Sequence, residues 1–153
     1  MIIIALVVEL VDAVDSKSTI FADVGVQVPP GAPSKVVMKC GIDLIEKSRI
    51  SKIYNSRFRE KFINRILTKS EQSRLKDDNH EYNISYLAKR WAAKEAVAKC
   101  LGCGIGGAIS FLDIEISSNE SGEPFAEIKK TDQKISISIS DTKESAIAMA
   151  ILL

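Results

Sequence analysis

The stretch SYLAKRWAAKEAVAKCL, residues 85–101, decides the fold of this 153-residue chain. It is rich in Ala, Lys and Leu, which are strong helix formers, and it contains neither Gly nor Pro. Gly102 follows directly, at the place where a helix commonly ends. The pattern therefore predicts one long helix over residues 85–101.

The segments on either side of this helix predict an α+β fold. On the N-terminal side, residues 40–45 read as a short strand and residues 57–66 have helical spacing. Thr68 and Glu71 form a capping box that opens a helix over residues 69–76. On the C-terminal side the period changes to that of strands, expected at residues 111–116, 124–128, 135–139 and 146–152, with turns at Ser121-Gly122 and Asp132-Gln133. Helices followed by strands predict an antiparallel sheet packed against the long helix.

Composition sets limits on the class of protein. The chain has 21 Lys and Arg against 20 Asp and Glu, with 46% hydrophobic and 27% charged residues, as expected for a soluble globular domain. No apolar run approaches the ~20 residues that span a bilayer. Three cysteines make no disulfide framework and fit a reducing cytoplasm. The balanced charge excludes a strongly basic nucleic-acid binder on bulk charge alone.

Residues 1–37 differ from the rest of the chain. They carry two basic and four acidic residues, whereas residues 38–153 carry 19 basic and 16 acidic residues. The segment Val26–Pro33 contains two consecutive prolines and a glycine, which break any regular element. Its codons could read GTT-CAA-GTC and GCA-CCA, like the T-loop and acceptor end of a tRNA gene. Two interpretations follow: a non-native extension translated through a tRNA gene, with Met38 as the native start, or a genuine strand with a Pro-rich linker.

Asp43 lies inside an apolar strand. Strand alternation places Ile42 and Leu44 on one face, and Asp43 with Gly41 and Ile45 on the other. A carboxylate in such surroundings is costly unless a cation or a metal ion pairs with it. Asp43 is therefore a candidate functional residue, and the alternative is an acid at a strand end that reaches solvent.

Trp91, Glu95 and Lys99 follow one another at intervals of four residues. On a helix they share one face. Glu95 can offer an oxygen ligand, and Lys99, one turn later, can offer a point charge to a phosphate. The alternative is a surface Glu–Lys pair, which contributes only ~0.3–0.5 kcal/mol.

Basic residues crowd the segment 47–74, which holds nine Lys and Arg against Glu60 and Glu71. Such a surface attracts an acidic partner and speeds its encounter. Nucleic acid is the rival partner, although few aromatic residues are present to stack on bases. A merely solvated basic face is the third interpretation.

Cys100 and Cys103 have the spacing of a redox or zinc motif. They lie at the expected end of a helix, where the dipole disfavours a thiolate. A zinc site needs about four ligands, and His80 is the only histidine. We therefore expect these cysteines to serve packing.

Taken together, several stretches between Met38 and Leu153 resemble the holo-[acyl-carrier-protein] synthase family of 4′-phosphopantetheinyl transferases. No single motif would suffice, but their order and spacing match the family. They are GIDLIE (41–46) with Arg49-Ile50, RILT (65–68) with Glu71, LAKRWAAKEA (87–96), Lys99 with LGCGIG (101–106), DIEI (113–116), Gly122 with Pro124, and SISIS (136–140) with Thr142-Lys143. Residues 1–37 have no counterpart in the family.

The resemblance implies an activity. Family members move 4′-phosphopantetheine from coenzyme A to a serine of apo-acyl carrier protein, with Mg²⁺, and release adenosine 3′,5′-bisphosphate; the reaction supports fatty acid biosynthesis. The usual assembly is a homotrimer. The resemblance also implies a cytoplasmic enzyme with no nucleic-acid or membrane partner. Two other classes remain as rivals, a non-catalytic carrier or nucleotide-binding module and, more remotely, a basic nucleic-acid binder.

The same resemblance implies roles for particular residues. Asp43 and Glu95 are expected to ligate Mg²⁺, and Lys99 to contact the phosphates as part of the catalytic machinery. The proton of the carrier serine is expected to pass either to Glu95 or to a metal-bound water. The remaining expected substrate contacts are Arg90, Gly102, Gly104 and Thr142 toward coenzyme A, and Arg49, helped by Lys61 and Arg65, toward the acidic carrier protein.

One departure from the family pattern bears on the site. The family often has Ser-x-x-His-Thr in the strand that here has Asp141 before Thr142, and that His lies near the bound nucleotide. An acid at this position is expected to repel phosphate. Lys39 and Cys40 also replace the glycine and apolar residue common before the Asp43 motif.

Overall fold

The computed structural model describes residues 38–153, and the expectation for residues 1–37 lies outside the described residues and stays a prediction. The described elements follow in chain order. They are β1 (Cys40–Glu46), α2 (Lys47–Tyr54), α3 (Arg59–Ile66), α4 (Lys69–Gln72), α5 (His80–Cys100), the 3₁₀ turn η1 (Phe111–Asp113), β2 (Ile114–Ser118), β3 (Pro124–Ile128), β4 (Ile135–Asp141) and β5 (Ser145–Leu152).

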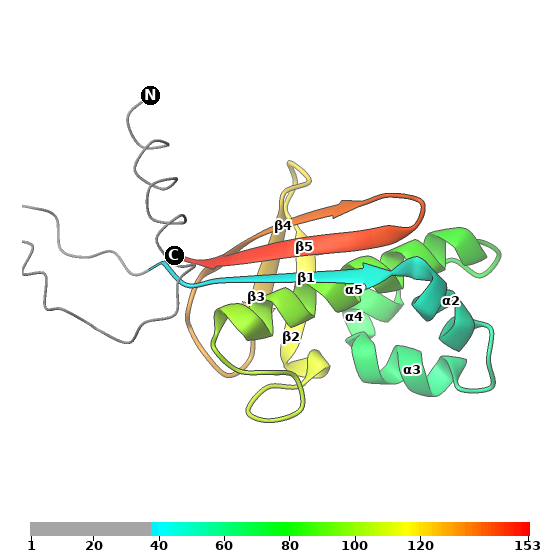
Figure 1. Cartoon of the computed structure of the whole chain (residues 1–153), viewed down its shortest axis with the longest axis horizontal. Helices are drawn as coiled ribbons and strands as arrows, with labels where there is room; N and C mark the ends of the chain where they lie inside the picture. Colours follow the sequence, from blue (N-terminus) through cyan, green and yellow to red (C-terminus); the bar gives the residue numbers. More distant parts are fainter. Residues whose placement is uncertain (1–37) are drawn as a thin grey trace, which may run out of the picture. The chain divides into compact units, whose positions relative to one another are not determined.

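The five strands form one antiparallel sheet in the order β1-β5-β4-β3-β2. The long helix α5 lies along one face of this sheet, and α2, α3 and α4 gather at the end where the β4–β5 turn also lies (Figure 1). The predicted α+β class, with an antiparallel sheet against a long helix, is confirmed. No helix within residues 38–153 is long and apolar enough to cross a membrane.

Small side chains set the close packing of α5 on the sheet. In β5 the inward residues are Ala146, Ala148 and Ala150, all buried. They face a helix whose buried side includes Ala92, Ala93 and Ala96. Alanine on both surfaces lets the helix axis approach the strands closely, so residues of β1 and α5 come within reach of each other.

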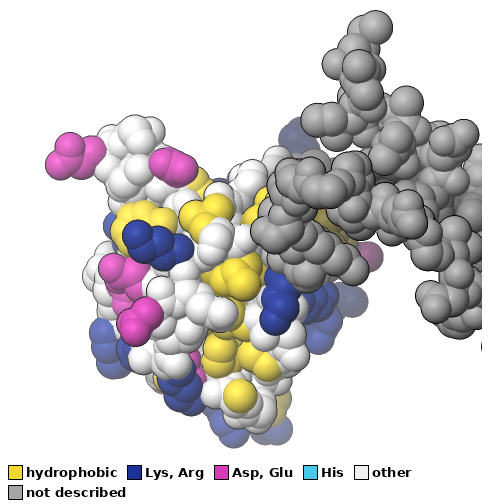
Figure 2. Space-filling view, turned by 90° about the vertical axis from the view of Figure 1, so that its left-hand side faces the viewer, with side chains coloured by type: hydrophobic (Ala, Val, Ile, Leu, Met, Phe, Trp, Pro, Cys, Tyr) yellow, Lys and Arg dark blue, Asp and Glu magenta, His cyan; other side chains and the backbone are white. Residues whose placement is uncertain are grey.

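Large apolar side chains reach the surface in several places. Those more than about a third exposed are Met38, Ile42, Leu44, Phe58, Leu112, Phe125, Ile147, Met149 and Leu153. Figure 2 shows hydrophobic side chains forming a band on one face, between acidic and basic side chains. Exposed apolar surface of this extent is typical of contact with another molecule.

The observed elements differ from the sequence-based expectations at four points. Helix α4 ends at Gln72 rather than at residue 76, because the N–H groups of Arg74 and Leu75 bond to carbonyls three residues back, as in a turn. Helix α2 was not predicted, although Ile50, Ile53 and Tyr54 have helical spacing, because eight residues are too few for the period to stand out. Helix α5 begins at His80 rather than at residue 85, since the Asn79 side chain accepts a hydrogen bond from the Tyr82 N–H and caps the helix earlier. The strand expected from residue 111 begins at Ile114, because Phe111–Asp113 form a 3₁₀ turn held by Ser110 and Asp113.

A buried ion pair lies between α4, α5 and β2. The Lys94 ammonium, fully buried, donates to Glu71 Oε2 at 2.5 Å and to the carbonyls of Ile66 and Phe111 at 2.8 and 3.0 Å. Glu71, 1% exposed, also accepts from the Ile116 N–H and forms the predicted capping box with Thr68. Burial lowers the pKa of Lys94, and the charge of Glu71 opposes that effect. The pair therefore joins five elements, α3, α4, α5, η1 and β2, within the core.

Gly41 is the position where β1 touches α5 most closely. A Cβ placed there would overlap the Ala96 carbonyl oxygen and lie 2.5 Å from the Cys100 backbone nitrogen. We expect Gly41→Ala to lower the free energy of unfolding by about 1–3 kcal/mol, because backbone atoms cannot move aside as a flexible side chain does. Urea denaturation measures this, with Gly107→Ala as control because a Cβ at Gly107 meets nothing within 4 Å. Equal stability in both variants would contradict the close approach.

Candidate active site

Four of the predicted site residues share one surface cleft. Its lining comprises Asp43, Leu44, Ile45, Glu46, Arg49, Trp91, Glu95 and Lys99, and its volume is about 580 Å³. Asp43 comes from the middle of β1, while Trp91, Glu95 and Lys99 come from one face of α5, as their spacing predicted. Arg49 comes from α2. The structure thus brings together three carboxylates, of which Glu46 was not predicted, and two cations from elements far apart in the sequence.

Lys99 binds directly to Asp43 in this cleft. Its Nζ lies 2.8 Å from Asp43 Oδ1 and also donates to the Ile42 carbonyl at 3.0 Å. The Asp43 side chain is 16% exposed, whereas that of Lys99 is 49% exposed. Lys99 can therefore reach a ligand without leaving the cleft, and the ion pair itself adds at most about 1 kcal/mol because it is partly solvated.

Glu95 has a raised pKa. Burial disfavours its charged form, and the negative charge of Asp43 adds to the shift, while Lys99 and Arg49 partly oppose it. Two carboxylates of one cleft thus lie close enough for one to affect the pKa of the other. Such a pair is disfavoured by itself and is stabilised by a cation bound between them.

The raised pKa of Glu95 makes a pH-dependent prediction for stability without divalent cations. The folded chain holds the Glu95 proton more tightly than the unfolded chain, so stability falls as pH rises through the raised pKa. Glu95→Gln cannot ionise at this position, so it does not lose this stability as the pH rises. We expect its melting temperature in EDTA to exceed wild type by about 1–3 °C at pH 7, and the difference to vanish near pH 4. Scanning calorimetry measures this, with exposed Glu127→Gln as control; a lower melting temperature for Glu95→Gln at both pH values would refute it.

The donor set of the cleft fits Mg²⁺ in its chemistry. Asp43 and Glu95 offer two carboxylates, and Mg²⁺ prefers one or two carboxylates plus phosphates and waters to a complete protein cage. Within residues 38–153 no group of three or more potential ligands gathers at one point. A substrate phosphate would therefore have to complete any metal site here.

Arg49 borders the same cleft beside an aromatic cluster. Its guanidinium lies 5.5 Å from the centre of the Trp91 ring, and Trp91 in turn packs against Phe62 and Phe111. Arg49 is exposed, as are Lys61 and Arg65, which lie one turn apart on α3. The basic surface therefore adjoins the two carboxylates.

Arg90 lies elsewhere. Its side chain is 10% exposed, its guanidinium lies over the Tyr86 ring at 4.5 Å, and its Nε is 3.7 Å from Glu71 Oε1. Within the described part of the chain that buried Nε has no hydrogen-bond partner. Arg90 thus belongs to the buried Glu71–Lys94 network, and its expected contact with phosphate stays a prediction.

Gly102 and Gly104 lie in the turn that follows α5. Gly102 has φ +77°, which favours glycine, and its N–H donates to the Lys99 carbonyl at 2.9 Å. A Cβ at Gly104 would meet nothing within 4 Å. Both glycines are exposed and directly follow the helix end that carries Lys99. Cys100 is buried at this end, which raises its thiol pKa and supports the packing interpretation.

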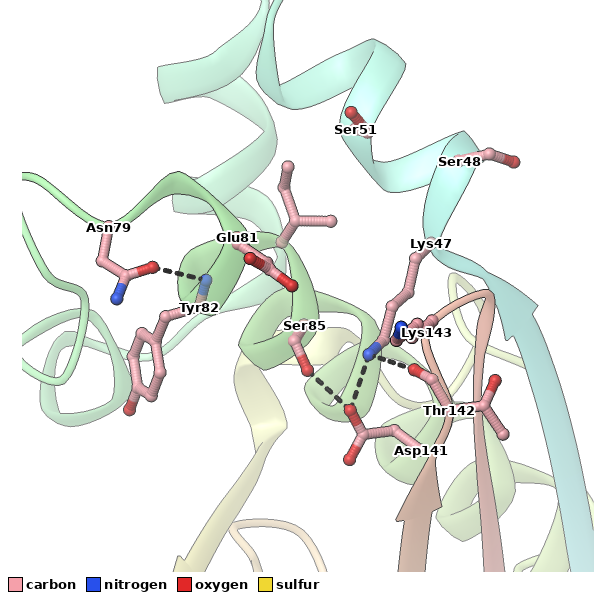
Figure 3. Close-up of a pocket in the computed structure, with 11 residues that line it drawn as sticks. Lys47, Ser48, Ser51, Asn79, Glu81, Tyr82, Ser85, Asp141, Thr142 and Lys143 are labelled. Carbon is pink, nitrogen blue, oxygen red and sulfur yellow. Dashed lines mark hydrogen bonds and ion pairs between the residues drawn. The ribbon is translucent and has the colours of Figure 1, made fainter.

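Thr142 lies in a second, larger cavity of about 870 Å³, which Figure 3 shows. Asp141 is central there: its Oδ2 accepts from Lys47 Nζ at 2.6 Å and from Ser85 Oγ at 2.7 Å, and its Oδ1 lies 3.4 Å from Lys89 Nζ. Burial raises the pKa of Asp141, but the hydrogen bonds from Lys47 and Ser85 and the charge of Lys89 outweigh it and lower the pKa to about 2.

This arrangement surrounds the Asp141 carboxylate with cations, and the expectation that it repels phosphate stays a prediction. Two ammonium groups and one carboxylate leave one net positive charge in the cluster. Sequence reasoning did not find Lys47, Ser85 and Lys89, because they lie 94, 56 and 52 positions from Asp141 along the chain. The only signal was the basic crowding after residue 47.

Comparison with known proteins identifies the family. The family model described as "4'-phosphopantetheinyl transferase superfamily" matches residues 39–152. Fold, cleft and match together place the chain in this superfamily of transferases.

Similar proteins narrow the assignment. Holo-[acyl-carrier-protein] synthases of Anoxybacillus flavithermus and Bacillus cereus are 38% and 40% identical over 117 residues, covering 76% of this chain and 96% of each relative. Among solved structures, a Bacillus anthracis holo-(acyl-carrier-protein) synthase in complex with CoA (3′,5′-ADP) has a TM-score of 0.67 and 40% identity, covering 76% of this chain and 97% of that one. A Helicobacter pylori holo-[acyl-carrier-protein] synthase in complex with coenzyme A has a TM-score of 0.65 and 37% identity, covering 74% of this chain and 99% of that one. The chain belongs to the holo-[acyl-carrier-protein] synthase family of enzymes.

Proposed function

We propose that this enzyme transfers 4′-phosphopantetheine from coenzyme A to a serine of apo-acyl carrier protein, in a Mg²⁺-dependent reaction that supports fatty acid biosynthesis in the cytoplasm. The observation that carries the proposal is the cleft in which Asp43, Glu95 and Lys99 meet. A non-catalytic module would have no need to retain two neighbouring carboxylates, one with a raised pKa, beside an accessible lysine.

The residues of the cleft divide the chemistry among them. The serine Oγ attacks the β-phosphorus of coenzyme A, the bond from that phosphorus to the bridging oxygen breaks, and adenosine 3′,5′-bisphosphate leaves. Lys99, half exposed beside Asp43, is placed to contact the pyrophosphate. The serine proton passes to Glu95 or to a water held beside the two carboxylates of the cleft.

Asp43 and Glu95 are also the residues that would hold Mg²⁺. When bound, the ion supplies positive charge against the negative charge that develops on the phosphates. The support for this is the donor set: two carboxylates that raise each other's energy when no cation separates them. The rest of the shell would come from substrate phosphate and water.

The outer face of the sheet supports assembly into a homotrimer. Ile42 lies opposite Met149, and Leu44 lies opposite Ile147, on the face away from α5. These four side chains are 37–60% exposed, whereas the inward residues of β5 are small alanines. We propose that further copies of the chain cover this apolar face, beside the cleft that contains Leu44.

Mass spectrometry tests the transfer directly. Apo-acyl carrier protein, coenzyme A and Mg²⁺ are incubated with the full chain, and the carrier should gain the mass of one phosphopantetheine. Omitting Mg²⁺ or adding EDTA should abolish the gain. An unchanged carrier mass under all conditions would refute the proposed function.

The basic residues of α2 and α3 make a prediction about the carrier. We expect Arg49→Glu and Arg65→Glu each to raise the KM for the carrier about tenfold, because reversing a rim charge slows the encounter with an acidic partner. For Arg65→Glu, the Kd for coenzyme A should stay unchanged. Steady-state kinetics at two salt concentrations check this, with exposed Lys134→Glu as control. A larger effect on coenzyme A than on the carrier would show that the surface has another role.

A further inference from the structure

The Asp141 cluster, defined as Asp141, Lys47, Ser85 and Lys89, fixes Lys47 at the wall of the 870 Å³ cavity. Lys47 is held at both ends: its backbone N–H donates to the Glu144 carbonyl at 2.7 Å, and its ammonium donates to Asp141 Oδ2 and to the Thr142 carbonyl at 2.6 and 2.5 Å. Its side chain is only 14% exposed. A lysine is ordinarily a mobile surface group, so this degree of fixation distinguishes Lys47 from the other basic residues of α2.

The cluster keeps unused binding capacity. An ammonium group has three donors, and Lys47 spends two of them within the chain. Lys89 lies 3.4 Å from the other oxygen of Asp141 and is 34% exposed, so it adjoins the cavity although it does not line it. The lining also includes the ammonium group of Lys143 and the carboxylate of Glu81 (Figure 3). Counted together with Lys89, three ammonium groups and two carboxylates leave one net positive charge, which suits an anionic group such as a phosphate.

We propose that Asp141 is a positioning residue, which orients the ammonium groups of Lys47 and Lys89 so that they bind a phosphate group of coenzyme A. This inference rests on the proposed function, which supplies the substrate. It assigns the acid a role opposite to that expected from its charge alone. Asp141 does not repel the phosphate; it holds the cations that attract it.

The change in coenzyme A affinity on replacing Asp141 by Asn distinguishes a positioning role from a purely electrostatic one, because the two roles predict changes of opposite sign. Asp141→Asn keeps the shape and removes one negative charge, so a purely electrostatic role predicts tighter binding of coenzyme A. If Asp141 positions the lysines, the same variant leaves two unrestrained ammonium groups that repel one another. We then expect the Kd for coenzyme A, measured by calorimetry, to rise about tenfold. Lys47→Met should raise it about as much, and the double variant should be no worse than Lys47→Met alone.

Kinetics and controls identify the cause of any change. The KM for coenzyme A should rise, while kcat at saturation and the KM for the carrier stay the same. Asp141→Glu, which keeps the charge, should recover part of the affinity. Asp132→Asn, the same change in the exposed β3–β4 loop, should have no effect. Melting temperatures of all variants confirm that each is folded at the assay temperature.

Dephospho-coenzyme A identifies the phosphate concerned. This ligand lacks the 3′-phosphate. If Asp141→Asn and wild type bind it equally well, the cluster binds the 3′-phosphate; if the variant still binds it more weakly, the cluster binds the pyrophosphate. The wild-type enzyme must first be shown to transfer phosphopantetheine. If Asp141→Asn then binds coenzyme A as tightly as wild type or more tightly, the inference about Asp141 is overturned and the proposed function stands. Absence of transfer by the wild type would instead overturn the proposed function.

Discussion

Asp43→Asn and Glu95→Gln should each reduce turnover by a factor of roughly 10² or more. Each variant keeps the shape of its side chain and removes one of the two carboxylate charges that we propose hold Mg²⁺ in the cleft. Stabilisation of developing phosphate charge is worth several kcal/mol, and each 1.36 kcal/mol corresponds to a factor of ten in rate. Phosphopantetheine transfer at increasing Mg²⁺ concentration measures the loss, and higher Mg²⁺ should restore activity only in part.

Stability measurements distinguish this role from a structural one. Asp43→Asn also removes the partner of Lys99, but that pair is half solvated and contributes at most about 1 kcal/mol. The melting temperature without metal should therefore fall little. As a control, the exposed variant Glu127→Gln should leave both turnover and melting temperature unchanged. Near wild-type turnover in either active-site variant would remove that residue from the site, and lower stability with full turnover would make it structural.

Lys94→Met should produce the largest loss of stability in the domain. The variant leaves the Glu71 carboxylate buried, with the Arg90 Nε, at 3.7 Å, as its nearest remaining cation, and leaves two carbonyl oxygens without their donor. Breaking a buried pair from one side costs about 3–5 kcal/mol, because one charge stays desolvated and uncompensated. Chemical denaturation measures the loss in the free energy of unfolding.

A double variant tests the cause of this loss. Glu71→Gln combined with Lys94→Met removes both charges, so it should be more stable than Lys94→Met alone. Lys69→Met, an exposed lysine on α4, should change stability by less than about 0.5 kcal/mol. If Lys94→Met were no more damaging than Lys69→Met, the buried pair would not contribute to the fold.

Local patterns in the sequence predicted most of the secondary structure. The helix-forming residues of 85–101, the Thr68–Glu71 capping box and the alternation through β3 and β4 are properties of short segments, and the structure confirms them. The boundaries were less certain, because the start of α5 depends on the Asn79 side chain and the start of β2 on the Ser110–Asp113 turn. The helical spacing of Ile50, Ile53 and Tyr54 in α2 is confined to eight residues, and it was missed.

The functional groups of the cleft were also predictable as types. The sequence shows an acid in an apolar strand, and it places Glu95 and Lys99 on one helix face. The family resemblance of the motifs implies that these residues act in one active site. Their geometry was not visible. The sequence could not show that Lys99 binds Asp43, that Arg49 borders the same cleft, or that Arg90 turns into the core.

What the sequence by itself determined is therefore the set of elements, the α+β class, the family resemblance and the chemistry-bearing residues, since these follow from local periodicity and short motifs. Only the tertiary structure decided which charges meet. The Ala-on-Ala packing of α5 against β5, and the close approach at Gly41, set Asp43 beside Lys99 and Glu95. The end of β4 likewise meets α2 and α5, so Asp141 pairs with Lys47 and Lys89. The physical reason is that the energy of a charge depends on its neighbours in space, and those neighbours lie about 50 to 95 positions away along the chain.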